Sequence, residues 1–272
     1  MLKAKLKYSD TRLIKRKNKG RFKGFLIFIF CVICCVFVFV LAGGLGNVLK
    51  VGSFSFLFKN NNDVVAEHSY YAVVMGEYET HSEAQAVASG VAVMGAGAYV
   101  WQTENKFLVV GNVYENKSDA EQVLKNIGGS GYNAFVKEIK FNKISLETSV
   151  LNQEQSQVVF SAVKFVDDVF LKCYDYAVKF DKSEIVSTVV SSELNTLKGS
   201  VRVWEGKLDV INSYAVTNLG LLIKNALVAI ELELDAAVLK VINGTSVNKD
   251  LKYLTTSVAI AKFNMYNSIK SL

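Results

Sequence analysis

The sequence predicts an α+β fold, in which a βαββαβ domain with a four-stranded antiparallel sheet lies between one transmembrane helix and an all-α antiparallel helical bundle. Three observations lead to this prediction. Two adjacent segments repeat one another without a gap, an uncharged run follows a basic N-terminus, and apolar residues of the C-terminal half recur with helical spacing. The expected segments are a basic cytoplasmic tail (1–23), the transmembrane helix (24–43), a juxtamembrane linker (44–68), the βαββαβ domain (69–141) and the helical bundle (145–272).

The internal repeat aligns residues 69–102 with residues 105–138 at a constant offset of 36. In each copy a β-rich run, Tyr71–Met75 or Phe107–Val110, ends at a residue that tolerates positive φ, Gly76 or Asn112. Each copy therefore begins with a strand. Repeats of this length usually contain one supersecondary unit that is used more than once.

A helix is expected to follow each strand. Each helix is expected to begin with a capping box, formed by Ser82 with Gln85 in the first copy and by Ser118 with Glu121 in the second. Apolar residues then recur at helical spacing, and a glycine ends each helix, Gly95 in the first copy and Gly131 in the second. Short strands come next, at 98–102 and 134–139, with a hairpin at 103–105 between the copies. The order β-α-β-β-α-β places both helices on one face of the sheet, so the other face is either bare or covered by residues outside the repeat.

The first copy resembles a known family. Residues 70–78 (Tyr-Tyr-Ala-Val-Val-Met-Gly-Glu-Tyr), followed by Ser82-Glu83-Ala84, resemble the opening of a SPOR domain, the sporulation-related repeat of bacterial envelope proteins. The resemblance covers residues 69–141. It implies binding to peptidoglycan glycan strands, especially strands stripped of stem peptides at division or sporulation septa, through the helix-free face of the sheet.

Side-chain alternation predicts which residues line that helix-free face, if Tyr71, Val73 and Val109 pack under the helices. Aromatic rings suit stacking on the C–H faces of sugars. The candidate glycan-binding residues are therefore Trp101, as the main anchor, with Tyr70, Tyr99, Phe135, Lys106 and Lys137. The alternative is that this face, which also carries Ala72, Val74, Leu108 and Val110, is buried beneath the C-terminal segment because it is so apolar.

The N-terminus predicts the location of the protein. Residues 1–23 hold ten Lys or Arg and one Asp, and an uncharged run of 18 residues, 25–42, follows. As a helix this run spans about 27 Å, close to the hydrocarbon thickness of a bilayer. The basic tail is expected to stay in the cytoplasm, which places the rest of the chain outside a bacterial cell membrane, at the septum if the SPOR resemblance holds.

Apolar periodicity predicts helices at 146–180, 183–197, 207–242 and 246–269, with Gly199 and Gly206 weakening the segment between the second and third, and Asn243-Gly244 ending the third. These helices are expected to form a three- or four-helix antiparallel bundle and to bind or space a protein partner.

The sequence favours a protein that is not an enzyme and that has no cofactor, metal site or nucleic-acid partner. Glu77, Glu79 and His81 cluster before the first helix of the repeat, but they are expected to be solvated loop residues, and His68 is expected to lie in the linker without a partner. Cys31, Cys34 and Cys35 fall in the transmembrane run, and Cys173 is alone in the exported part.

Three hypotheses follow. The first is a membrane-anchored envelope protein that binds septal glycan in cell division or sporulation. The second is a scaffold whose SPOR-like fold has lost glycan binding and mediates protein contacts; it is favoured by apolar Val74, Leu108 and Val110 at positions where the family often has polar or basic residues. The third, a wall hydrolase that uses the SPOR-like part for targeting, lacks a recognisable carboxylate or metal constellation.

Overall fold

The computed structural model describes residues 64–129, 131–145, 153–214, 218–244 and 246–271. The fold is α+β, and Asn61–Leu272 form one compact unit. Among the described residues, no helix combines the length and apolarity needed to cross a membrane. The basic tail, the run at 25–42 and nearly all of the expected linker lie outside the described residues.

The repeat forms a four-stranded antiparallel sheet from β2 (His68–Tyr78), β3 (Tyr99–Gln102), β4 (Phe107–Tyr114) and β5 (Phe135–Phe141), in the spatial order β3-β4-β2-β5. This is the predicted βαββαβ arrangement. The expectation that the first strands end at Gly76 and Asn112 is wrong, because β2 and β4 continue beyond both residues. Register shifts near Val74 let the two strands keep pairing there, as at a β-bulge.

Helices α2 (His81–Val93) and α3 (Lys117–Asn126) occupy equivalent places in the two copies. Both begin earlier than the expected capping boxes. Thr80 caps α2, and it forms a reciprocal capping box with Glu83. Asn116, 36 residues later, is the N-cap of α3. The sequence thus held two overlapping S/T-x-x-E/Q patterns in the first copy, and the earlier one caps the helix because Thr80 has the extended backbone of an N-cap.

The ends of these two helices match the prediction only in part. Gly95 follows the C-cap of α2 with a φ of 84°, as expected of a glycine that ends a helix. Gly131 also has a positive φ, but α3 already ends at its C-cap Ile127, so Gly131 belongs to the loop before β5.

Four long helices follow the sheet: α4 (Gln153–Asp181), α5 (Ser187–Tyr214), α6 (Asn218–Asn243) and α7 (Val247–Lys270). The expected weak point at Gly199 and Gly206 is wrong, because α5 runs through both glycines. The expected end at Asn243-Gly244 is confirmed, and Gly244 has a φ of 74°.

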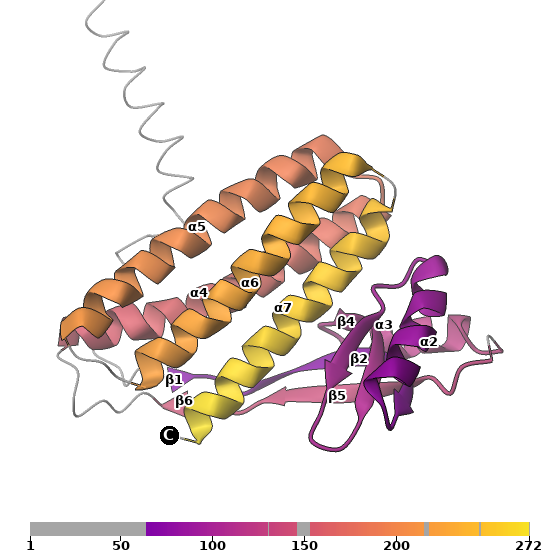
Figure 1. Ribbon diagram of the computed structural model, residues 1–272, viewed down its shortest axis with the longest axis horizontal. Helices are drawn as coiled ribbons and strands as arrows, with labels where there is room; N and C mark the ends of the chain where they lie inside the picture. The colour runs from indigo at the N-terminus through magenta and orange to yellow at the C-terminus, as the bar shows by residue number, and fades with distance from the viewer. Residues whose placement is uncertain (1–63, 130, 146–152, 215–217, 245, 272) are drawn as a thin grey trace, which may run out of the picture. The chain divides into compact units, whose positions relative to one another are not determined.

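The two faces of the sheet belong to two apolar clusters. Tyr71, Val73 and Val109 lie on the α2/α3 side, as alternation predicted. The opposite face packs against α4 and α7, and its residues belong to one continuous core with the four helices. Figure 1 shows α7 lying along this face of the strands, with α2 on the other side of the sheet.

A second, two-stranded sheet joins the segments on either side of the repeat. β1 (Val64–Val65) pairs antiparallel with β6 (Ile144–Ser145), and Val65 and Ile144 are buried in the core shared with the bundle. Residues expected to be linker therefore begin the folded unit.

Candidate functional site

The helix-free face of the sheet is covered by the bundle. The indole of Trp101 is only 5% exposed and meets the ring of Phe263 on α7 edge-on, with 5.5 Å between centroids. Tyr70 is 7% exposed and stacks on Phe170 of α4 at 4.2 Å. Sugar rings have no access to either aromatic face while α4 and α7 stay in place.

The other candidate glycan-binding residues are also not gathered on an open surface. Tyr99 and Phe135 are partly buried against the same core, and Tyr99 lies 5.3 Å from Tyr253 of α7. Lys137 places its ammonium 6.0 Å from the Trp101 ring centroid. Lys106 is solvent-exposed and lies 3.7 and 3.8 Å from the carboxylates of Glu77 and Glu79.

Alternation therefore predicted the direction of these side chains correctly, and the expectation of an accessible aromatic platform is wrong for Trp101 and Tyr70. The alternative expectation, burial beneath the C-terminal segment, describes the structure. The physical reason is the apolar character of the face. Ala72, Val74, Leu108 and Val110 are all almost completely buried, and removing such side chains from water is the main driving force for packing.

The covered face surrounds one charged group, the ammonium of Lys262 on α7, whose residue is 0% exposed. Its Nζ lies 2.8 Å from His68 Nε2, 2.9 Å from the Tyr70 hydroxyl and 3.0 Å from Asp167 Oδ1. These three partners match the three donors of an ammonium. They come from β2 and α4, so the lysine joins the sheet to two helices of the bundle.

A second layer of contacts fixes these partners. The hydroxyl of Tyr266, one helical turn beyond Lys262, donates to both oxygens of Asp167 at 2.9 and 3.0 Å. His68 Nδ1 lies 3.1 Å from the carbonyl oxygen of Ala66. A neutral imidazole that donates from Nδ1 and accepts at Nε2 satisfies both of its contacts. We call Lys262, His68, Tyr70, Asp167 and Tyr266 the Lys262 network.

Aromatic rings enclose the ammonium of Lys262. Its Nζ lies 4.4 Å from the centroid of Phe141 and 4.5 Å from that of Tyr70, and the rings of Phe170 and Tyr266 are within 6 Å. The imidazole of His68 stacks on Phe141 at 4.7 Å. A cation enclosed by ring faces is stabilised by their quadrupoles, which offsets part of its desolvation.

Burial perturbs the titration of the network. It lowers the pKa of Lys262, and the Asp167 carboxylate opposes this effect. Burial, followed by the Lys262 charge, lowers the pKa of His68. Burial together with the Asp167 charge raises the pKa values of Tyr70 and Tyr266, so both remain phenols at physiological pH.

Lysine, histidine, tyrosine and carboxylate side chains also serve as general acids and bases in enzymes. Catalysis requires that a substrate reach the group, and Lys262 is enclosed by its own chain. The contacts of the ammonium instead connect three elements, because His68 and Tyr70 lie on β2, Asp167 lies on α4, and Lys262 itself lies on α7. The Lys262 network is a fully hydrogen-bonded polar cluster inside an apolar interface, and we call it a lock because it stabilises one arrangement of the sheet and the bundle.

The sequence offered faint signals for this network. Asp167 and Asp168 stand between the apolar pairs Phe165-Val166 and Val169-Phe170, and Lys262 follows Val258–Ala261 in α7. A charge on the buried stripe of an amphipathic helix calls for a partner. The expectation that His68 lies in a linker without a partner is wrong, because His68 begins β2 and contacts Lys262.

The remaining sequence candidates lie apart from the network. Glu77 is the penultimate residue of β2, Glu79 precedes α2, and His81 is the first residue of α2, with its ring 5.6 Å from that of Phe107. Cys173 is completely buried on α4, and burial raises the pKa of its thiol to about 12. Cys31, Cys34 and Cys35 lie outside the described residues.

Comparison of the chain with protein-family models, with curated proteins and with solved structures found no match.

Proposed function

We propose that this protein is a non-enzymatic scaffold of the bacterial envelope, tethered by residues 24–43, in which the SPOR-like sheet is a packing module for the helical bundle. The observation that carries this proposal is the burial of Trp101 and Tyr70 beneath α4 and α7. The sheet contributes one wall of the core, and the outer surface of the bundle is left for contacts with other proteins.

Magnitudes favour this proposal over glycan binding at the same face. Exposing one large apolar side chain costs about 1.5–3 kcal/mol, and lifting α7 exposes at least Trp101, Leu108 and Tyr70 and also breaks the Lys262 network. A central aromatic anchor typically contributes about 2 kcal/mol or somewhat more to an interface. Sugar stacking on Trp101 therefore does not offset the cost of opening the face.

The competing proposal is the septal glycan-binding protein that the SPOR resemblance implies. A co-sedimentation assay separates the two. The full chain, solubilised in mild detergent, is mixed with sacculi whose stem peptides have been removed enzymatically, and the pellet is compared with a sacculus-free control. We expect no specific retention.

The matched variant is Trp101→Ala, with Trp204→Ala on α5 as the control for loss of a tryptophan outside the sheet. We expect Trp101→Ala to lower the unfolding temperature. Specific retention of the wild type, abolished by Trp101→Ala without a change in unfolding, would overturn the scaffold proposal in favour of glycan binding.

The proposed location has its own test. The net charge of +9 in residues 1–23, next to an uncharged run, supports a cytoplasmic N-terminus. Protease added to intact cells after removal of the wall should digest the chain beyond residue 60 and spare the tail. Protection of the C-terminal half would refute the envelope location.

A further inference from the structure

The outer face of α5 and α6 carries large exposed apolar side chains. On α6, Leu232 and Leu239 are 66% and 63% exposed, and Leu221 and Val228 are exposed as well. On α5, Val203 is exposed in the same way. Isolated surface leucines are ordinary, but several on one pair of helices form the kind of patch that marks an interaction site. We call this surface the α5/α6 face.

Residues of the α5/α6 face follow a seven-residue spacing, which joins apolar residues on α6 and small residues on α5. On α6 it joins Leu221 to Val228 and Leu232 to Leu239. On α5 it joins Ser192, Gly199 and Gly206. A Cβ added at Gly199 or Gly206 would meet no atom within 4 Å. Helix α6 therefore presents large side chains, and α5 presents shallow positions at Gly199 and Gly206 on either side of Val203, at the spacing used by coiled coils.

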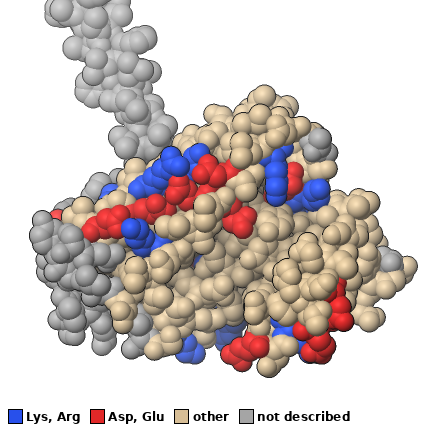
Figure 2. All heavy atoms as spheres, in the orientation of Figure 1, with Lys and Arg blue, Asp and Glu red and all other residues tan. Residues whose placement is uncertain are grey.

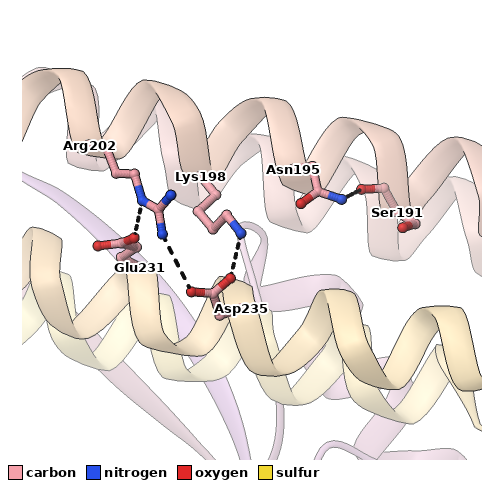
Figure 3. A network of polar contacts seen from close by, with 6 residues as sticks. All are labelled: Ser191, Asn195, Lys198, Arg202, Glu231 and Asp235. Carbon is pink, nitrogen blue, oxygen red and sulfur yellow. Dashed lines mark hydrogen bonds and ion pairs between the residues drawn. The ribbon is translucent and has the colours of Figure 1, made fainter.

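A row of ion pairs runs between the two helices and fixes their register. Lys198 Nζ lies 2.5 Å from Asp235 Oδ1, Arg202 pairs with Glu231, and Lys224 Nζ lies 2.5 Å from Asp209 Oδ1. In each pair the two residue numbers have the same sum, so α5 and α6 are antiparallel and in register. Figure 3 shows the first two pairs, and Figure 2 shows the charges interleaved in a band over α5 and α6, bordered by uncharged surface.

We propose that the α5/α6 face binds a second copy of this chain, through a twofold axis parallel to the two helices. Such an axis places α5 of one copy over α6 of the other and leaves every residue at its own level along the helices. An isologous contact of this kind is the commonest route to a homodimer. It deepens the proposed scaffold role by naming the partner.

The levels set by the ion pairs make the two copies complementary in shape. Because Arg202 is level with Glu231, Leu232 of one copy faces the space between Gly199 and Val203 of the other. By the same register, Val228 faces the space between Val203 and Gly206. Large side chains thus meet glycines and their neighbours, as knobs meet holes.

The same axis makes the copies complementary in charge. Lys198 and Arg202 of α5 lie over Asp235 and Glu231 of the partner copy's α6. Arg202 is more than half exposed and already reaches Glu231 and Asp235 of its own chain, and its guanidinium carries five donors, which leaves capacity for a further acceptor. The alternative twofold axis, perpendicular to the helices, places α5 on α5, and at the level of Lys198 and Arg202 it sets these basic residues against one another. Charge therefore favours the parallel axis, which sets opposite charges over one another along the whole row of ion pairs.

The size of the face suits a stable dimer. A helix of 26 residues is about 39 Å long at 1.5 Å per residue, and two neighbouring helices are about 20 Å wide. The footprint is about 800 Å² per copy, which matches the standard size of a specific protein–protein interface.

Light scattering coupled to size exclusion tests the proposal on the full chain in mild detergent, with the detergent mass subtracted. We expect a dimer for the wild type. Leu232→Glu should yield a monomer, and so should Gly199→Leu, which fills the position that Leu232 of the second copy would occupy. The control is Leu171→Glu, at an exposed leucine of α4, and it should stay dimeric.

The glycine variant separates loss of the dimer from loss of folding. Gly199 lies within a helix with open space around it, so a leucine there should leave the fold intact or stabilise it through helix propensity. A wild-type monomer would refute the dimer and leave the scaffold proposal standing. A dimer that survives both Leu232→Glu and Gly199→Leu would show that other residues hold the copies together, and would overturn this assignment.

A charge swap tests the axis itself. Arg202→Glu with Glu231→Arg keeps the pair within each chain but, in a mixed dimer, sets like charges over one another. We expect subunit exchange, followed by energy transfer between labelled copies, to give fewer mixed dimers than the statistical half. A statistical mixture would refute the parallel axis.

Discussion

Removing the counter-ion of Lys262 is the most informative perturbation of the fold. In Asp167→Ala the ammonium, which is 0% exposed, keeps two neutral partners and loses the one carboxylate that the described part of the chain places within 4 Å of it. Breaking a buried ion pair by removing one partner costs about 3–5 kcal/mol. Neutralising the lysine sets an upper limit, because moving a proton off a group of pKa about 10.4 at pH 7 costs about 5 kcal/mol. We expect a loss near 4 kcal/mol.

Two further measurements identify the mechanism of this loss. Lys262→Met in the Asp167→Ala background removes the unpaired charge and keeps an unbranched chain, so most of the lost stability should return. The loss should also shrink between pH 7 and pH 10. The folded lysine has the lower pKa, so the unfolded state binds more protons in this window, and stability rises with pH.

Urea unfolding of the full chain, followed by tryptophan fluorescence, measures all three effects, because Trp101 lies at the interface between sheet and bundle. The control is Asp175→Ala, which removes an exposed pair with Lys179 and should cost less than about 0.5 kcal/mol. If Asp167→Ala lies within about 1 kcal/mol of the wild type, or if adding Lys262→Met restores nothing, the network is not a lock and the reasoning fails.

Three other predictions concern the stability of the fold. Trp101→Ala should cost about 3–5 kcal/mol in urea unfolding, as expected of a core tryptophan, and a cost below about 1 kcal/mol would contradict its burial. Gly97→Ala should destabilise the fold by about 1–3 kcal/mol because its Cβ would lie 2.7 Å from the backbone of Lys252. Gly199→Ala should stabilise the fold by about 0.5–1 kcal/mol because the position is open and alanine is the better helix former. If Gly97→Ala unfolds at the same temperature as Gly199→Ala or at a higher one, this packing is refuted. The pKa of His68 is lowered in the folded state, so the unfolded state binds more protons between pH 7 and pH 5, and the wild type loses stability on acidification. His68→Gln should lose less stability over the same pH range. Equal slopes of unfolding free energy against pH for the wild type and the variant would contradict this prediction.

The repeat made the sheet predictable. Its constant offset fixed the order of strands and helices, and alternation assigned Tyr71 to one face and Tyr70 to the other, as the structure has them. What a strand pattern alone does not contain is the identity of the element that covers each face. The apolar residues around Leu108 indicated that something covers them, and the covering helix, α7, comes from the far end of the chain.

Glycine misled the prediction of the bundle. Gly199 and Gly206 each cost a helix about 1 kcal/mol relative to alanine, which suggested a break. The buried stripe of α5, with Leu194, Val201 and Leu208, continues across both glycines, and burial of these side chains outweighs the propensity term. Both glycines lie on the outer side of α5, with open space around them.

The Lys262 network was beyond a single sequence for a different reason. Asp167 and Lys262 lie on different helices, and His68 and Tyr70 lie on a strand, so their meeting depends on how the bundle docks on the sheet. A charged residue among apolar residues on a buried stripe indicates that it has a partner. It does not say which one, and pairing across such separations needs tertiary structure.

The order of the elements along the chain has a consequence for biosynthesis. β5 ends at Phe141 and α7 begins at Val247, so the ribosome adds roughly 100 residues, over about 5–20 s, between the strand and the helix that covers it. During this interval α7 does not yet cover the face that carries Trp101 and Leu108. A nascent chain in this state exposes an apolar surface and several aromatic rings. We therefore expect a chaperone to bind this surface until α7 emerges from the ribosome, or the chain to leave the ribosome slowly enough for α7 to pack first.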